Sequence, residues 1–297
     1  MVKYSDKYFY IKISVVFLLF LLSMLHFAHE IRANEIGALQ LFKLASAGDK
    51  DAIANFAKEG GNLNIQDDRG RTALHLALRN RNSKLNGAKL LLANGIDPEI
   101  EDLRGRTALH YAAHRGQSVI VDLLIKAQVN IDHKDTNAVT PLMLAGQKGH
   151  LETAKKLVNS GASVQAQDGD GWTVLLYSTE GGLNLVQYLI EQGADVKATD
   201  NIGWNVLIHS ANSDYKDVVD LIIEKGENVN SQGNDGMTAL MAASQKGYLN
   251  TVQLLLNKGA NRDLKDTTGE TALDKARNKG HEDVVELLMK RDSKVTS

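Results

Sequence analysis

The stretch that decides the fold is Gly70-Arg71-Thr72-Ala73-Leu74-His75, because it returns as Gly105-Arg106-Thr107-Ala108-Leu109-His110. Shorter versions of the same phrase then begin at Ala138, Gly171, Gly203, Gly236 and Gly269. Successive phrases start 35, 33, 33, 32, 33 and 33 residues apart. Self-similarity at a period of this length is typical of a solenoid, in which one structural unit is stacked many times.

Each repeat also carries signals that begin and end a pair of helices. The threonine of the phrase can cap the first helix by accepting hydrogen bonds from free backbone N–H groups. A second helical stretch follows, for example residues 151–158, and a glycine such as Gly161 then ends it, because the residue past a helix end often adopts a positive φ. An Asp-x-x-Gly turn, as in Asp102 to Gly105, leads into the next phrase.

These residues resemble the ankyrin repeat, whose signature contains Thr-Pro-Leu-His-x-Ala. The resemblance covers residues 36–291 and implies an all-α ankyrin-repeat solenoid with short β-hairpins, which project as fingers at right angles to the helix pairs. It also implies a protein without shared catalytic activity that binds other proteins through its concave face and finger tips. The expected repeats lie near 36–66, 67–101, 102–134, 135–167, 168–199, 200–232, 233–265 and 266–291.

Bulk composition narrows the class of protein further. The net charge of −2 gives no case for binding nucleic acid or an anionic membrane surface. The absence of cysteine excludes disulfides, thiolate metal sites and a cysteine nucleophile. Because a single repeat cannot bury its own apolar face, stability must come from the interfaces between neighbouring repeats. We expect one elongated, monomeric array at residues 34–291, followed by a flexible tail at 292–297.

The N-terminal 33 residues have the layout of an export signal. Lys3, Lys7 and Lys12 precede an apolar run over residues 13–28, which is short for a membrane span. Cleavage after Ala33 would release a signal peptide, whereas an uncleaved segment would anchor the protein, and a buried or chance segment is the third reading. In the first two cases the repeats lie outside the cytosol, in the periplasm or secreted, since the positive residues stay inside.

Several repeats depart from the pattern. The second has a polar insertion near residues 81–83, and the fifth is one residue short near Thr179. In the sixth, Asn205 replaces the capping threonine and Asp214 replaces the glycine between the helices. Ser178 and Ser210 replace the small alanine that packs between helices. We therefore expect the fifth and sixth repeats to be the softest part of the array.

No constellation of residues predicts catalysis, a cofactor or a metal ion. His75 and His110 occupy the signature position, where the family uses histidine within the scaffold. His110 and His114 share a helix face, but no glutamate follows His110 as a zinc-protease motif requires. The stretch from Asp168 to Gly171 resembles the start of a calcium loop and then fails at its later ligand positions. We interpret it as a hairpin turn and the chain as non-enzymatic.

The residue after each hairpin turn is the candidate for partner binding. It is Val139, Trp172, Trp204 and Met237 in four successive repeats, and the chain has no other tryptophan. Repeats stacked about 10 Å apart would align these side chains in an apolar stripe about 30 Å long. An exposed apolar stripe usually marks a partner site, and tryptophan is enriched among binding hot spots. Alternatively, each tryptophan folds against its own finger and only stabilises it.

The concave helix surface adds Tyr111, Tyr177 and His209, each one residue after the signature histidine position. Its rim is expected to be basic and either steers an acidic partner or is simply solvated; the rim residues are Arg79, His114, Arg115, Lys148 and Lys246. The sequence thus predicts an exported or membrane-anchored adaptor for an unidentified protein partner. A passive scaffold in the cell envelope and a secreted effector acting on host proteins remain the alternatives.

Overall fold

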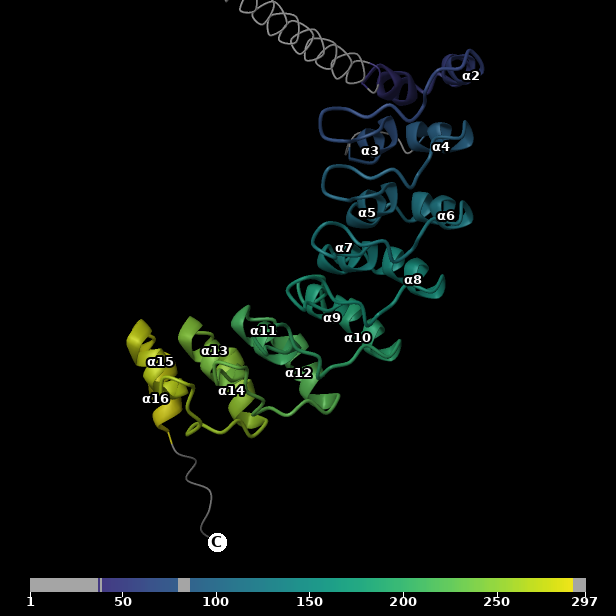
Figure 1. Ribbon diagram of the computed structural model, residues 1–297. Coiled ribbons are helices and arrows are strands. Elements are labelled where there is room, and N and C mark those ends of the chain that lie inside the picture. The colour runs from purple at the N-terminus through teal and green to yellow at the C-terminus, as the bar shows by residue number, and fades with distance from the viewer. Residues whose placement is uncertain (1–36, 38, 80–85, 291–297) are drawn as a thin grey trace, which may run out of the picture. The chain divides into compact units, whose positions relative to one another are not determined.

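The computed structural model describes residues 37, 39–79 and 86–290. The expected export segment, the insertion near 81–83 and the tail at 292–297 lie outside these residues. Within them, the helices are all too short or too polar to cross a membrane. The chain forms two compact units, the first ending at Ala108 and the second beginning at Leu109. Both consist of stacked helix pairs with hairpin fingers, which confirms the fold expected from the repeats (Figure 1).

The first unit packs three short helices and a helical stretch at residues 39–47. The helices are α2 (Lys50–Lys58), α3 (Ala73–Arg79) and α4 (Asn86–Ala93). Its core contains Leu41, Ile53 and Leu74, which are fully buried. Helix α4 approaches the preceding repeat closely, because a Cβ on Gly87 would lie 2.9 Å from the carbonyl oxygen of Ala45.

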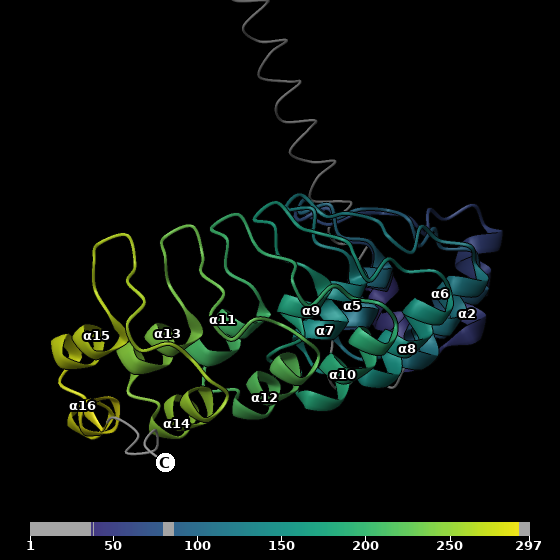
Figure 2. The same ribbon diagram turned by 90° about the horizontal axis from the view of Figure 1, so that it is seen from below.

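The second unit continues the alternation over most of the chain. Its helices are α5 (Ala108–His114), α6 (Ser118–Lys126), α7 (Pro141–Gln147), α8 (Leu151–Asn159), α9 (Val174–Tyr177), α10 (Leu183–Glu191), α11 (Val206–Asn212), α12 (Lys216–Glu224), α13 (Ala239–Lys246), α14 (Leu249–Asn257), α15 (Ala272–Lys279) and α16 (Glu282–Met289). The odd-numbered helices form an inner row and the even-numbered helices an outer row. The fingers project from the inner row, above α11, α13 and α15 in Figure 2.

The inner helices begin where the sequence predicts. Thr173 caps α9 by accepting a hydrogen bond of 3.2 Å from the backbone N–H of Leu176. Asn205 does the same for α11, with 3.0 Å to the N–H of Ile208, so its replacement of threonine is mild. Thr140, Thr238 and Thr271 cap α7, α13 and α15 in the same way.

Residues with a positive, left-handed φ follow the helices, including at positions where another residue replaces glycine. Gly161 has φ of 100°, and Gln128 adopts φ of 61° at the equivalent place after α6. Asp214 follows α11 with φ of 60°, and Ala138 has the same φ in the finger before α7. The fold therefore imposes this conformation on three residues whose Cβ atoms disfavour it.

The fingers form fewer backbone pairs than the expected β-hairpins. In the described ranges, pairing within a finger is reduced to isolated bridges, such as Gln167 to Thr173, and no extended strand forms. Neighbouring fingers of the second unit are instead joined tip to tip by backbone hydrogen bonds. These run from Gly169 N–H to Asn137 O (2.9 Å), Asn201 to Asp170 (3.0 Å), Asn234 to Ile202 (3.0 Å) and Thr267 to Asp235 (2.9 Å).

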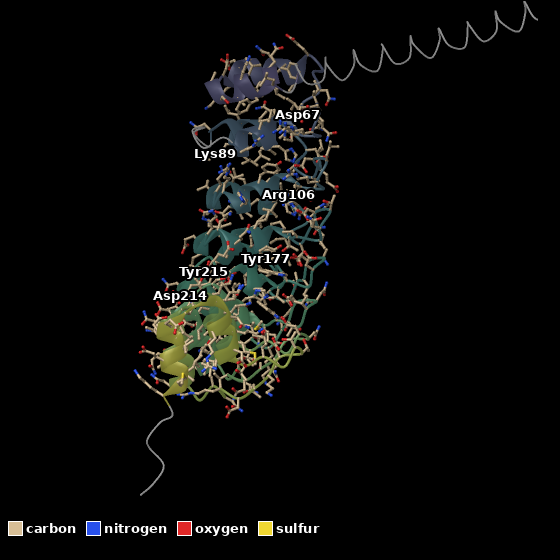
Figure 3. The ribbon with its side chains drawn as sticks, turned by 90° about the vertical axis from the view of Figure 1, so that its left-hand side faces the viewer. Asp67, Lys89, Arg106, Tyr177, Asp214 and Tyr215 are labelled. Atoms are coloured by element: carbon tan, nitrogen blue, oxygen red, sulfur yellow. The ribbon has the colours of Figure 1, made fainter. Side chains whose placement is uncertain are left out.

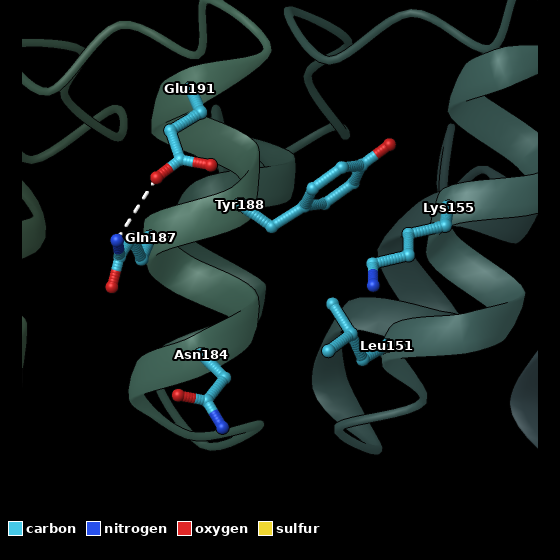
Figure 4. A pocket seen from close by; sticks show the side chains of 6 residues that line it. All are labelled: Leu151, Lys155, Asn184, Gln187, Tyr188 and Glu191. Carbon is cyan, nitrogen blue, oxygen red and sulfur yellow. Dashed lines mark hydrogen bonds between the residues drawn. The ribbon is translucent and has the colours of Figure 1, made fainter.

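The fifth repeat is irregular, as its missing residue predicts. Helix α9 has only 4 residues, and Gly181 and Gly182 follow it, with Gly182 at φ of 95°. An open groove of about 300 Å³ lies between the outer helices α8 and α10, beside Leu151, Lys155 and Tyr188 (Figure 4). The expected softness of this region stays a prediction.

Candidate functional site

The aspartate that opens a finger organises its backbone. Oδ1 of Asp168 accepts hydrogen bonds from the N–H groups of Asp170 (3.0 Å) and Trp172 (2.8 Å). Oδ1 of Asp200 accepts equivalent bonds from Ile202 (3.1 Å) and Trp204 (2.9 Å). This arrangement fixes the turn, so both tryptophans leave their fingers from the same place. Asp168 is thus explained as a hairpin residue, in agreement with the interpretation of Asp168 to Gly171.

The second carboxylate oxygen ties the finger to its own inner helix. The Tyr177 hydroxyl donates to Oδ2 of Asp168 (2.7 Å), and Nε2 of His209 donates to Oδ2 of Asp200 (2.8 Å). Burial raises the pKa of Tyr177 above 10.0, and its hydrogen bond to Asp168 adds to the shift. The polar atoms of Tyr177 and His209 therefore serve the scaffold. In Figure 3, Tyr177 lies on the side of the fingers, whereas Asp214 and Tyr215 lie on the opposite side, in the turn between α11 and α12.

The two tryptophans enclose His209. Its ring centroid lies 4.7 Å from that of Trp172 and 5.3 Å from that of Trp204, with both pairs tilted. Trp172 also contacts Tyr177 edge to face, with centroids 5.5 Å apart. Aromatic pairs at such distances stabilise by about 1 kcal/mol beyond the area they bury. The cluster of Trp172, Tyr177, Trp204 and His209 thus joins the fifth repeat to the sixth.

Trp204 also reaches the next finger. Its Nε1 donates to both oxygens of Asp235, each at 3.2 Å. The indole lies against Gly233, where a Cβ would come within 2.5 Å of Trp204 Cδ1. Gly233 stands where other repeats have the finger aspartate, and this substitution leaves room for the ring. The sequence shows both residues but cannot show that one accommodates the other.

The expected exposed stripe is shorter than predicted. Val139 and Met237 are only 5% and 8% exposed, so they belong to the core and not to a free surface. Trp172 and Trp204 are half-buried, each with some surface accessible to solvent. The stacking of repeats explains the burial of Val139 and Met237, since neighbouring fingers cover the side chains at the two ends of the expected stripe. The role of the two tryptophans in partner binding stays a prediction.

Side chains at the finger tips were missed by the sequence reasoning. Ile202 is 54% exposed at the tip of the sixth finger. Asp170 and Asp235 are exposed on the fingers to either side of it. The signal for them is their position immediately before the turn glycine, which is Gly171, Gly203 or Gly236. They extend the candidate surface beyond the tryptophans.

The remaining candidates on the inner row contribute less. Tyr111 is half-buried on α5. Lys148 and Lys246 are exposed at the C-terminal ends of α7 and α13, the ends distant from the fingers, and Arg79 is exposed at the end of α3. His114 and Arg115 are half-buried, so only part of the expected basic rim is free.

The signature histidines are part of the scaffold. Nδ1 of His75 accepts a bond from the Thr72 N–H (3.1 Å), and its Nε2 donates to the carbonyl oxygen of Arg106 (3.0 Å). His110 likewise donates to the carbonyl oxygen of Val139 (3.0 Å). Burial lowers the pKa of His75, which keeps the ring neutral. Within residues 39–79 and 86–290, no three acidic or histidine side chains are grouped to hold a metal ion.

Comparison with known proteins gives the same repeat along the chain. The family described as ankyrin repeats in three copies matches residues 17–102, 41–135, 81–168, 142–233 and 207–297. The chain is also similar to the ankyrin repeat domain of Bcl-3, at 30% identity and a TM-score of 0.60. That match covers 75% of this chain and 100% of the other.

Curated relatives share only a segment with this chain. Alpha-latrotoxin-Lt1a of Latrodectus tredecimguttatus is 33% identical over 141 residues, which is 45% of this chain and 10% of the toxin. Palmitoyltransferase AKR1 of Lachancea kluyveri is 31% identical over 142 residues, which is 47% of this chain and 19% of the enzyme. This chain thus spans a tenth to a fifth of the lengths of these two relatives.

Proposed function

This chain belongs to the ankyrin-repeat family, and from that premise we propose that it binds a protein partner through the fingers of its second unit. Ankyrin repeats indicate a protein–protein interaction module, so the proposal concerns where and how this one binds. The surface we propose, called the finger surface below, consists of Asp168–Trp172, Asp200–Trp204 and Gly233–Gly236. The exposed parts of Trp172 and Trp204 at its centre are the observation that carries the proposal.

The geometry of the fingers supports binding with little reorganisation. Their tips are hydrogen-bonded to one another, and Asp168 and Asp200 hold them to the inner helices. A preformed surface loses less conformational entropy on association than a mobile loop does. Tryptophan offers a large contact area with few rotatable bonds, which suits it to anchor a partner on such a surface.

We further propose that the chain has no enzymatic activity of its own. The titratable groups of the finger surface are aspartates, and Asp168 and Asp200, which open their fingers, are engaged by backbone and side-chain donors. The AKR1 similarity covers a part of that enzyme that includes repeats of this kind. A bound cofactor or metal that persisted through purification would contradict this proposal.

Export stays a proposal that rests on residues 3–33 of the sequence. If the segment is cleaved after Ala33, the mature protein begins at Asn34, and its intact mass falls by that of residues 1–33. If it stays as an anchor, the full-length protein is recovered with the membrane fraction and external protease digests the repeats. Full-length protein in the cytosolic fraction would contradict both.

A crosslinking pull-down tests the partner site. Wild type is compared with Trp172→Ala/Trp204→Ala, and circular dichroism melts are recorded for both. We expect a protein captured by wild type to be lost from the variant. Because each indole also packs on His209, a conservative Trp172→Phe/Trp204→Phe variant separates binding from folding. It should keep the melting temperature near wild type and recover part of the capture.

Unchanged capture by both variants would reject the finger surface as the partner site. Capture of no protein by wild type would instead favour the passive scaffold, in which the tryptophans only join repeats. A partner of host origin would identify the chain as a secreted effector, and a partner from the same cell would identify an adaptor.

A further inference from the structure

We propose that the finger surface selects an arginine-bearing segment of the partner protein, in extended conformation, with a guanidinium lying against each tryptophan. This inference rests on the proposed function and adds the chemistry of the partner. It is carried by the charge of the finger surface, by the exposure of its carboxylates and by the spacing of its aromatic rings.

The charge of the finger surface is of one sign. It contains Asp168, Asp170 and Asp235, together with Asp200, which is buried and bonded by His209, and it contains no lysine or arginine. Fingers of the first unit differ, since Asp67–Arg71 and Asp102–Arg106 together carry four arginines and three aspartates. The family fold therefore does not require acidic fingers, and the second unit carries a distinct surface.

The carboxylates are accessible to a partner. Asp170 and Asp235 are exposed, and among the residues that the structure describes neither forms an ion pair. Asp235 already orients the Trp204 indole through Nε1, so its charge lies at the edge of that ring. Asp168 is bonded by a neutral donor, the Tyr177 hydroxyl, and its negative charge is not cancelled. A cation on this surface would gain attraction without displacing a resident one.

Arginine suits this arrangement better than lysine does. A guanidinium is planar and stacks on aromatic faces while it donates hydrogen bonds to a carboxylate at its edge. The Trp204 indole lies beside the Asp235 carboxylate, and on the preceding finger the exposed Asp170 stands two residues before Trp172. The exposed Ile202 between them offers an apolar contact for the segment that carries the arginines.

Spacing of the repeats sets the register of the segment. Stacked helix pairs lie about 10 Å apart, and an extended chain advances about 3.3 Å per residue. Arginines three positions apart would therefore meet successive tryptophans. The segment predicted to fit therefore has the pattern Arg-x-x-Arg, one arginine for each tryptophan.

Intrinsic fluorescence tests the inference directly, because Trp172 and Trp204 are the only tryptophans of the chain. The full chain is titrated with a glycine–serine peptide that carries arginine at every third position. The control peptides replace arginine by citrulline, which keeps the shape and removes the charge, or by lysine. We expect a saturable change in tryptophan emission with the arginine peptide, weaker binding of the lysine peptide, and no change with citrulline.

Charge-neutral variants show whether the carboxylates take part. Asp170→Asn/Asp235→Asn keeps one acceptor oxygen at each position, removes the charge and should raise the Kd of the arginine peptide roughly tenfold, about threefold for each exposed carboxylate. Asp195→Asn/Asp263→Asn makes the same change in net charge at exposed positions of the same unit outside the finger surface and should leave the Kd unchanged. Equal binding of the citrulline peptide, or equal loss in both variants, would overturn the inference.

The pull-down separates this inference from the proposed function. If the partner depends on Trp172 and Trp204 but binds Asp170→Asn/Asp235→Asn as tightly as wild type, the finger surface is the partner site and the arginine preference is wrong. If the partner does not depend on the tryptophans, the proposed function itself fails.

Discussion

At the scale of the residue, the aspartate that opens a finger forms a pair with the residue that donates a hydrogen bond to its Oδ2. The donor changes from repeat to repeat: it is Tyr177 for Asp168, His209 for Asp200 and Lys275 for Asp266. In the seventh repeat the aspartate is replaced by Gly233, and the donor position holds Ala242. In these four repeats the two positions match, as expected if an unpaired carboxylate there is costly, whereas Asp67, which stands nine residues before Leu76, is bonded by Arg71 instead.

Removing the hydroxyl of Tyr177 tests this pairing. Tyr177→Phe should lower the free energy of unfolding by about 1.5 kcal/mol, because the part-buried carboxylate of Asp168 loses a charge-assisted hydrogen bond. Tyr188→Phe is the matched control, since the buried Tyr188 hydroxyl has no hydrogen-bond partner among the described residues and its loss should cost almost nothing. Urea unfolding of the three proteins gives the comparison. Equal losses in both variants would contradict the assigned role of Tyr177.

The Lys275 cluster predicts a dependence on pH. Lys275 is buried and lies 2.5 Å from Oδ2 of Asp266 and 3.0 Å from Oε2 of Glu270. Burial alone would raise the pKa of Asp266, but hydrogen bonds from Lys275 and Thr268 outweigh it and hold the pKa well below 3.8. For Lys275, burial opposes the charge, yet the bonds to both carboxylates raise its pKa above 10.5. The stability from Asp266 is therefore present above 3.8 and lost as the pH falls, and that from Lys275 is lost above 10.5.

Lys275→Met should consequently cost about 3 kcal/mol near neutral pH, because it leaves a buried carboxylate without its cation. The difference between wild type and variant should shrink as the pH falls below 3.8, because Asp266 then takes up a proton in the unfolded chain while it stays ionised in folded wild type. Denaturant titrations over a pH series measure it, with Lys279→Met on the exposed side of α15 as the control. A difference that stays constant down to pH values far below 3.8 would refute this account of the cluster.

At the scale of the element, the repeat period predicts helices, caps and turns because it sums the same weak signals over many copies. Thr173, Asn205 and Gly161 behave as a single repeat would suggest. What the sequence could not predict depends on the neighbouring repeat. Val139 was expected on the surface and is buried, since only the stacked fingers decide which side chains they cover.

Left-handed residues other than glycine offer a test of how strongly the fold imposes its turns. Ala138 has φ of 60° at the finger position that is glycine in other repeats. Ala138→Gly should raise the free energy of unfolding by about 0.5–1 kcal/mol, because it relieves the strain at Cβ. Ala198→Gly, at negative φ in a neighbouring repeat, should lower it by a similar amount through added chain entropy. Chemical denaturation measures both, and equal signs would contradict the assignment of strain.

At the scale of the molecule, the chain carries two units whose fingers differ in chemistry. Arginines line the fingers of the first unit. Aspartates line three fingers of the second, and two of these fingers also carry a tryptophan. The family and its interaction role could be predicted from the sequence, because they follow from the period and the phrase. The enclosure of His209 by two indoles could not, since it joins side chains 5 and 37 residues apart through the stacking of repeats.

The central claim is that the fingers of the second unit hold the partner. Site-specific photo-crosslinking tests it most directly, with a benzophenone amino acid placed at Ile202 on the finger tip or at Leu249 on the outer helix α14. Both side chains are apolar and exposed, at 54% and 37%, so the two substitutions are closely matched. We predict that the partner is captured from Ile202 and not from Leu249. Capture from Leu249 alone would place the partner on the outer row and contradict the account.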